Sequence, residues 1–228
     1  MNELSASDLD TKRLILVPAL VTLAVTAARL AGELLHGPGR FFNSEPGGPW
    51  SIVGIIWLAP IFGIYFALKL AAHGQGPKSL GRAVGFALLS VAVVLAFSFV
   101  GALLHLQQNF RGRLLYGWTV VAVAALVTLP GWAALFRTLL AYAYAARVPV
   151  AVLMFFAFWR DWGTHYDAVP PDFPDGLGLM AKYLWLGFFP QLIFWVGLTV
   201  LAGMLFGSLA AGIAHLARRK PQIVEKTL

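Results

Sequence analysis

Long apolar segments with few or no charges make up most of this chain. A helix needs about 20 apolar residues to cross a hydrocarbon core of about 30 Å. Inside such a core a helix also satisfies all of its backbone polar groups within one segment. The segments predict an all-α integral membrane protein with about six spanning helices, at about residues 14–35, 49–70, 84–105, 115–136, 138–159 and 191–216.

Composition supports the membrane class. Hydrophobic residues make up 59% of the 228 residues and charged residues 12%, and the mean hydropathy is +0.76. Soluble domains average about 45–50% apolar and about 25% charged residues. Such a chain has too little polar surface to cover a soluble core, so we predict one polytopic membrane domain over residues 1–228. The first apolar segment offers no convincing cleavage site, and we expect it to be retained.

The basic residues of the connections predict the orientation, because cytoplasmic loops carry an excess of Lys and Arg. With both termini inside, ten basic residues fall on the cytoplasmic side and five on the outer side. An indole near an interface can bury its ring and hydrate its N–H. Five tryptophans fall near predicted outer boundaries: Trp50, Trp118, Trp159, Trp162 and Trp185. We predict an N-in/C-in multi-pass protein of the bacterial cytoplasmic membrane.

The boundary between the fourth and fifth spans depends on Arg137, the one charge in that region, and we place the connection there. A rival turn at Pro130-Gly131 would lay residues 132–146 along the inner surface. It would leave about 14 residues for the fifth span, which is too few to cross. The sequence therefore favours the connection at Arg137.

The last apolar window, residues 183–217, is too long for one crossing. Its 35 uncharged residues would form a helix of roughly 52 Å. Because Pro190 divides the window, we predict a short interfacial helix at about residues 177–189, after an outer loop at 160–182. Small residues recur at four-residue spacing in the first and last spans (Ala24, Ala28 and Gly32; Gly203, Gly207 and Ala211). This spacing predicts that the two spans pack closely, within the chain or between copies.

Acidic residues are absent from most of the spanning region. No carboxylate lies between Glu45 and Asp161, and this stretch holds most of four predicted spans. A buried carboxylate is the usual carrier of a proton or cation at membrane depth. The sequence therefore disfavours cation-coupled transport.

Arg147 is the strongest single candidate for a functional residue. It lies about ten residues into the fifth predicted span, roughly 15 Å deep. An arginine there costs at least about 2.5 kcal/mol on insertion scales, so it should face protein, water or an anionic ligand. Two roles are open: a contact to an anion or lipid head group, and a structural arginine that bonds a carbonyl freed by Pro149 or reaches the interface.

Arg29 and Glu33 lie four residues apart in the first span, so they share a helix face and can form an ion pair. Glu33 is the only acid near membrane depth in the sequence. In the alternative arrangement Glu33 is the counter-ion of Arg147, which requires the first and fifth spans to touch.

The outer loop gathers Asp161, His165 and Asp167 within seven residues. Such side chains can hold a divalent cation or act as an acid–base pair. Their spacing matches no specific metal motif, so we assign neither a metal nor a catalytic residue and expect a solvated loop that suits a docking partner. A bis-histidine haem would need a facing pair such as His36 and His105. A histidine at the interface is commoner, and we predict no cofactor.

The chain has no cysteine, which excludes disulfides, thiolate metal sites and cysteine nucleophiles. It also lacks the phosphate-binding loop, the zinc-protease helix motif and the nucleophile-elbow motif. We predict a non-catalytic scaffold or accessory subunit that contacts membrane lipids, other membrane subunits or its own copies, and no nucleic acid. The alternatives are a small permease that binds an anionic or lipid-like solute with Arg147, a lipid-active enzyme that uses the residue 161–167 loop, and a haem or quinone redox role.

Overall fold

The computed structural model describes residues 10–46 and 51–219, and these residues form helices and connections without a β-strand. Six helical stretches of the described chain are long and apolar enough to span a membrane: Thr11–Leu34, Ile55–Ala72, Leu80–Leu103, Phe110–Val127, Ala133–Arg160 and Leu179–Ala217. The predicted all-α fold with six such helices is confirmed. Trp50 and the basic residues beyond 219, which entered the orientation argument, lie outside the described residues, as do the first two residues of the second predicted span.

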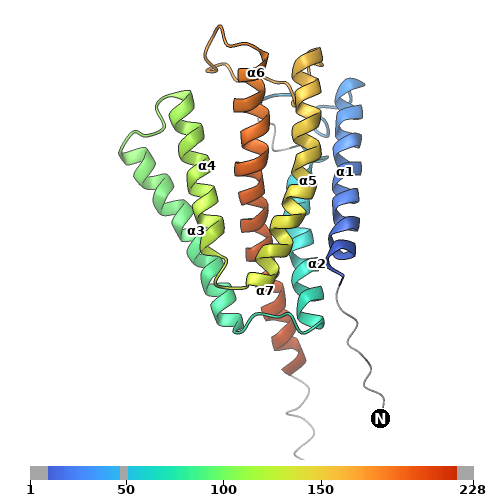
Figure 1. Cartoon of the computed structure of the whole chain (residues 1–228), viewed down its shortest axis with the longest axis vertical. Helices are drawn as coiled ribbons and strands as arrows, with labels where there is room; N and C mark the ends of the chain where they lie inside the picture. The colour runs from blue at the N-terminus through green and yellow to red at the C-terminus, as the bar shows by residue number, and fades with distance from the viewer. Residues whose placement is uncertain (1–9, 47–50, 220–228) are drawn as a thin grey trace, which may run out of the picture.

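The helices form one bundle around α7 (Figure 1). In chain order they are α1 (Thr11–Leu34), η1 (Ile55–Trp57), α2 (Leu58–Ala72), α3 (Leu80–Leu103), α4 (Phe110–Val127), α5 (Ala133–Arg160), α6 (Leu179–Lys182), η2 (Tyr183–Phe188), η3 (Pro190–Trp195) and α7 (Val196–Arg219). α7 packs on α2, α3, α4 and α5, whereas α1 packs on α5. We call the end where α1 begins and α7 ends the base, and the opposite end the loop end.

Capping side chains fix where three of the helices begin. Asp10 Oδ1 accepts a hydrogen bond from the Lys12 backbone N–H at 3.0 Å, ahead of α1. Asn109 Oδ1 accepts one from Gly112 at 2.7 Å, ahead of α4, and Ser79 caps α3 in the same way. Such caps satisfy backbone donors that the first helical turn leaves without partners.

Glycines let α2 and α7 cross with their backbones in contact. A Cβ atom on Gly63 would lie 2.4 Å from Gly203 Cα, and one on Gly207 would lie 2.6 Å from the Gly63 carbonyl oxygen. Gly203 and Gly207 therefore do support close packing, but their partner is α2 and not the first span. Ala24 and Ala28 of α1 are exposed instead, so these small residues do not pack against the last span within the chain, and their packing between copies stays a prediction.

Apolar side chains face outward and polar side chains face inward along parts of the bundle. Leu95, Phe99 and Leu103 of α3 are each at least 66% exposed. α1 instead buries a polar stripe, Thr22, Thr26, Arg29 and Glu33. Soluble proteins bury their apolar side chains and leave charged ones in water. The reversed pattern is the one that a bundle surrounded by hydrocarbon requires.

The connection between α4 and α5 lies at residues 128–132 and not at Arg137. Pro130 cannot continue α4, and Gly131 packs against α3, where a Cβ would lie 3.0 Å from the Phe86 side chain. Residues 132–146 do not lie along a surface, because α5 runs unbroken through Pro149 for 28 residues. Arg137 is therefore an exposed residue in the first turns of α5.

The segment before α7 is not an interfacial helix. Residues 179–219 are helical throughout, and α6, η2, η3 and α7 follow one another along one direction (Figure 1). Pro190 is absorbed by π-helical turns on either side of it. The bundle accommodates this long helix because α7 extends beyond the neighbouring helices at the base, where Ile213 and Leu216 are exposed.

Replacing Gly63 with alanine should separate α2 from α7, because the new methyl group would meet the Gly203 backbone, which cannot move aside. Overpacking of a tight interior costs about 1–3 kcal/mol. We expect Gly63→Ala to lower the thermal midpoint of the protein in detergent, measured by circular dichroism. Gly212→Ala on α7, where a Cβ meets nothing within 4 Å, is the matched control; an equal change in both variants would contradict the close-crossing interpretation.

Candidate functional site

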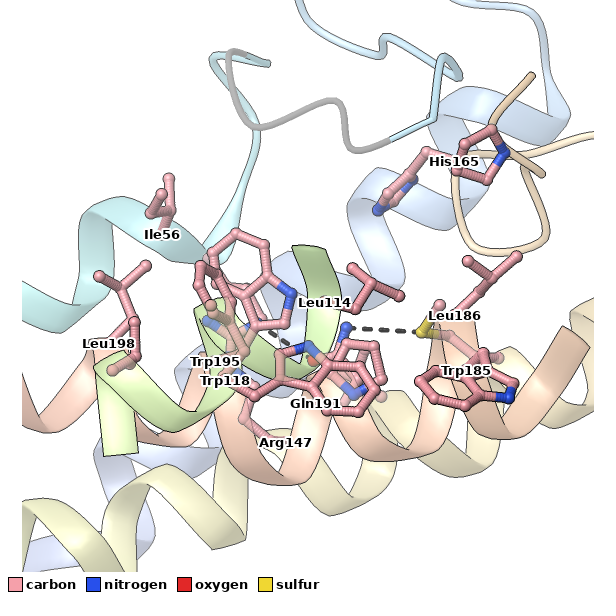
Figure 2. Close-up of a pocket in the computed structure, with 18 of the residues that line it drawn as sticks. Ile56, Leu114, Trp118, Arg147, His165, Trp185, Leu186, Gln191, Trp195 and Leu198 are labelled. Carbon is pink, nitrogen blue, oxygen red and sulfur yellow. Dashed lines mark hydrogen bonds between the residues drawn. The ribbon is translucent and has the colours of Figure 1, made fainter. Parts of the chain in front are cut away.

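A cavity of about 660 Å³ lies in the half of the bundle nearer the loop end. Its walls come from α1, η1, α3, α4, α5, the connection between α5 and α6, and the η2–η3–α7 segment. Figure 2 shows the side chains that line it. The volume falls within the range of about 300–1,000 Å³ that is usual for small-molecule sites. The cavity is therefore large enough to hold an organic ligand.

The charged side chains that line the cavity are basic. Arg29, Arg113 and Arg147 contribute to the wall together with His165, and no Asp or Glu of the described residues lines it. Arg29 pairs with Glu33 behind the wall, and Arg113 pairs with Asp172 at the exposed loop end. The wall therefore favours anions over cations.

Aromatic rings cover much of the remaining wall. The rings of Trp118 and Trp185 stack with centroids 5.7 Å apart, and Trp195 is a third tryptophan of the wall. Tyr116 and Phe194 also line the cavity. Such rings offer flat apolar surface with a few polar edges. They suit a ligand with an apolar body, and an aromatic one in particular.

Arg147 reaches this cavity from the middle of α5 and is 6% exposed. Its Nη1 donates a hydrogen bond to Gln191 Oε1 at 3.3 Å, and its Cζ lies 5.0 Å from the centre of the Trp195 ring. Gln191 Nε2 in turn lies 3.4 Å from Met154 Sδ, and Figure 2 draws both contacts of this amide. The ion pairs of the described residues do not include Arg147. Arg147 thus contacts a neutral amide and an aromatic ring, whereas the sequence suggested a carboxylate or a backbone carbonyl as its partner.

The remaining N–H groups of Arg147 are open to the cavity. A guanidinium has five N–H donors, and the bond to Gln191 uses one of them. In the described part of the chain, Ser208 Oγ is the side-chain polar atom that is fully covered and lacks a hydrogen-bond partner, and no nitrogen atom of Arg147 is in that state. The other nitrogen atoms of Arg147 are therefore not sealed in the interior, and Arg147 is among the lining residues. They can reach an anion that enters the cavity.

π-helical turns bring Gln191 and Trp195 to Arg147. Pro190 has no N–H to donate to the preceding turn, and the helix widens on both sides of it as η2 and η3. π-helical turns within longer helices are frequent at functional sites. This segment contributes Trp185, Gln191 and Trp195 to the wall, so the local irregularity of the helix builds part of the cavity.

Glu33 and Arg29 together join three segments at the loop end. Glu33 Oε1 accepts a hydrogen bond from Arg29 Nε at 2.8 Å, and Glu33 Oε2 accepts one from the His165 backbone N–H at 2.8 Å. His165 Nδ1 lies 2.6 Å from Oε1 and 2.8 Å from Oε2. Arg29 Nη2 also donates to the Asn43 carbonyl oxygen at 3.1 Å. The predicted Arg29–Glu33 pair is present. Although α1 packs on α5, Glu33 is the partner of Arg29 and His165 and not the counter-ion of Arg147.

Glu33 also fixes the tautomer of His165. An ionised carboxylate only accepts hydrogen bonds, so Nδ1 carries the hydrogen and Nε2 of the neutral ring keeps its lone pair. Burial lowers the pKa of His165 below its ordinary value, and the bond to Glu33 opposes this effect. The imidazole is therefore neutral near pH 7. It lines the cavity as a group that can still accept a proton.

The predicted ligand set of Asp161, His165 and Asp167 does not converge. Asp167 accepts hydrogen bonds at 2.7–2.8 Å from residues 163–164 and closes its own turn. Asp161 is exposed in the left-handed conformation that ends α5, with φ of 53°. His165 turns to Glu33 instead. The described part of the chain holds no group of three or more His, Asp or Glu side chains placed to bind a metal ion.

The cavity therefore combines three residues that the sequence singled out, Arg29, Arg147 and His165, and omits both aspartates. Sequence reasoning missed Gln191 and Trp195. Gln191 lies in a long uncharged window, directly after a proline. A polar amide at such a position was the available signal. His36 follows α1 and His105 follows α3, at opposite edges of the bundle (Figure 1), so they do not share a haem-binding face.

Comparisons with protein-family models, with curated proteins and with solved structures found no match to this chain.

Removing the Glu33 carboxylate should be far more damaging than removing an exposed one. Its side chain is fully covered, so Glu33→Ala would leave the Arg29 guanidinium buried without its counter-charge. Breaking a buried pair in this way costs about 3–5 kcal/mol. We expect a loss of this size in the free energy of unfolding, measured by denaturant titration in detergent micelles.

Asp172→Ala is the control, because it breaks the exposed pair with Arg113, and exposed pairs contribute about 0–1 kcal/mol. Similar losses in the two variants would show that the Glu33 cluster does not hold the loop end together.

Proposed function

We propose that the chain is a multi-pass membrane protein that binds a small amphipathic anion in the cavity, as the solute-recognition step of a small permease. Arg147 contacts the anionic group, and the tryptophan-rich wall contacts the apolar body. The sequence pattern also leads us to propose an N-in/C-in orientation in a bacterial cytoplasmic membrane. The cavity would then lie in the outer half of the membrane.

Insertion into a membrane is supported by the outward apolar and inward polar side chains of the bundle. Large apolar residues such as Leu95 and Phe99 would lose contact with water on insertion, which is the main favourable term for a spanning helix. The buried polar stripe of α1 meets partners inside the bundle: Thr22 Oγ1 lies 2.8 Å from Tyr142 Oη, and Arg29 pairs with Glu33. Polar groups at membrane depth need such partners.

The observation that carries the proposal is the position of Arg147, a buried arginine that borders a cavity and has no carboxylate partner within the described chain. Holding a positive charge in low dielectric is unfavourable, and an arriving anion would relieve that cost. An arginine with a purely structural role would be expected to donate its hydrogen bonds to the backbone carbonyls that Pro149 leaves without a partner. Here it meets a side-chain amide and a ring that can both accommodate a ligand.

The site gives less support to a lipid-active enzyme and to cation transport. The acid–base set at 161–167 is not assembled, so the lipid-active enzyme loses its catalytic group. A cavity lined by arginines and no carboxylate of the described residues offers nothing to hold a cation. The scaffold or accessory-subunit role stays a prediction, and binding a solute does not exclude it.

Replacing Arg147 with glutamine should weaken anion binding. A hydrogen bond to a charged group contributes about 1.5–3 kcal/mol, so the dissociation constant of 1-naphthoate should rise about 10- to 150-fold. Tryptophan fluorescence of the protein in lipid nanodiscs would report the binding. Arg137→Gln, which removes an exposed arginine from the same helix, should leave the affinity unchanged.

Failure of 1-naphthoate and of longer alkyl carboxylates to bind the unmodified protein would overturn the proposal. Uptake of labelled 1-naphthoate into proteoliposomes tests the permease step separately. Binding without uptake would reject the permease and retain the binding site.

The orientation can be tested with single cysteines, since the natural chain has none. Asp175 is exposed in the connection between α5 and α6, which lies at the loop end, and Lys78 is exposed in the connection between α2 and α3, which lies at the base. A membrane-impermeant maleimide added to intact cells should label Asp175→Cys and spare Lys78→Cys until the cells are lysed. The opposite pattern would reverse the proposed topology.

A further inference from the structure

Among the described residues that line the cavity, His165 is the one whose charge can change near neutral pH, since the other charged lining residues are arginines. Glu33 holds its Nδ1–H, and the backbone N–H of the same residue binds the same carboxylate. The ring is thereby fixed in place while Nε2 remains the site for a second proton. Binding of an anion by Arg147 alone does not require that Glu33 holds the His165 ring in this way.

The groups around His165 act on its charge in opposite directions. Arg29 and Glu33 on α1 form a pair, Asp167 on the same connection is held by three donors of its own turn, and Tyr166 is a neutral phenol whose pKa is raised by burial. Glu33 and Asp167 favour a protonated imidazole, whereas Arg29 and burial oppose it. One additional negative charge nearby can therefore tip the ring to its charged form.

The charge of the cavity wall then depends on His165. Arg29 and Arg113 are each paired with a carboxylate, so with a neutral imidazole the wall carries a net charge of one, on Arg147. This charge matches a monoanion such as a carboxylate. A phosphate monoester carries about two negative charges at pH 7, because its second pKa is about 6. A protonated His165 would supply the second positive charge.

We propose that His165 takes up one proton at Nε2 when a dianionic head group binds, so that a phosphate monoester enters the cavity with a proton and a carboxylate enters without one. The inference rests on the proposed function, because it requires that the cavity binds amphipathic anions. The proton comes from solvent, Nδ1–H stays on Glu33, and no covalent bond of the ligand changes. His165 would thereby determine which ligands depend on pH.

The test compares two ligands with the same apolar body, 1-naphthoate and 1-naphthyl phosphate. Their binding to the protein in nanodiscs is measured by calorimetry at pH 7.5, in two buffers of different ionisation enthalpy, because the difference in heat counts the protons exchanged. We expect about one proton taken up with the phosphate and about none with the carboxylate. The affinity for the phosphate should rise up to about tenfold for each unit that the pH falls from 8.5 to 7, and that for the carboxylate should stay constant.

In the variant His165→Asn the proton uptake with 1-naphthyl phosphate should be lost, and at pH 7.5 the affinity for 1-naphthyl phosphate should fall by a larger factor than that for 1-naphthoate. His36→Asn is the matched control, because His36 is exposed at the same end with φ of 53°, a conformation that asparagine tolerates. The unmodified protein gives a second measurement that needs no folded variant. With ¹⁵N-labelled histidine, 1-naphthyl phosphate should convert one neutral Nδ1–H imidazole signal into an imidazolium signal, and 1-naphthoate should not.

Uptake of a proton that persists in His165→Asn would mean that the phosphate itself is protonated, and would overturn the inference. So would 1-naphthyl phosphate binding to the unmodified protein without proton uptake, while 1-naphthoate still binds. If 1-naphthoate does not bind at all, the proposed function fails first, and the two failures are thus told apart.

Discussion

Glu33 provides the one carboxylate of the six long helices of the described chain, and together with Arg29 it holds three segments together at the loop end. The two oxygen atoms of Glu33 accept hydrogen bonds from Arg29 on the same helix and from His165 in the connection after α5. Arg29 in turn reaches the carbonyl oxygen of Asn43. A buried charge is tolerated only with such partners, because its desolvation is costly. Because Glu33 is already engaged, the other buried arginine has no carboxylate partner in these helices.

Arg147 is that second arginine, and its surroundings follow from this lack of a carboxylate. With Glu33 engaged elsewhere, its contacts are the Gln191 amide and the Trp195 ring, which carry no net charge. Both come from the π-helical segment around Pro190. The uncompensated charge therefore lies on the wall of a cavity, where an anion can approach it. The proposed function and the proposed role of His165 are two consequences of one charge balance.

The close crossing of α2 and α7 makes room for this arrangement. Gly63 and Gly203 bring the two backbones into contact, which fixes α7 at the centre of the bundle. The α3–α4 hairpin lies beside α7 near the base and leans away toward the loop end (Figure 1). The cavity lies between this hairpin, α5 and the π-helical turns, and tryptophans line it without filling it. Tight packing at one level of the bundle thus accompanies an open site at another.

Much of the architecture could be predicted from the sequence because its signals are local. Six apolar stretches, the Arg29–Glu33 spacing and the burial of Arg147 each depend on residues within one helix. The α4–α5 boundary was misplaced because a length rule was preferred to the turn signal of Pro130-Gly131. The interfacial helix was wrong because Pro190 was taken as a break, whereas π-helical turns absorb it.

The sequence by itself determined that the chain forms apolar helices with too few acids to neutralise its buried arginines. The tertiary structure alone decided which arginine receives the carboxylate, that His165 leaves the two aspartates to join Glu33, and that Gln191 and Trp195 face Arg147. These contacts join residues up to 132 positions apart. They depend on which helices touch and at what depth, and a periodicity read along one helix carries no information about that.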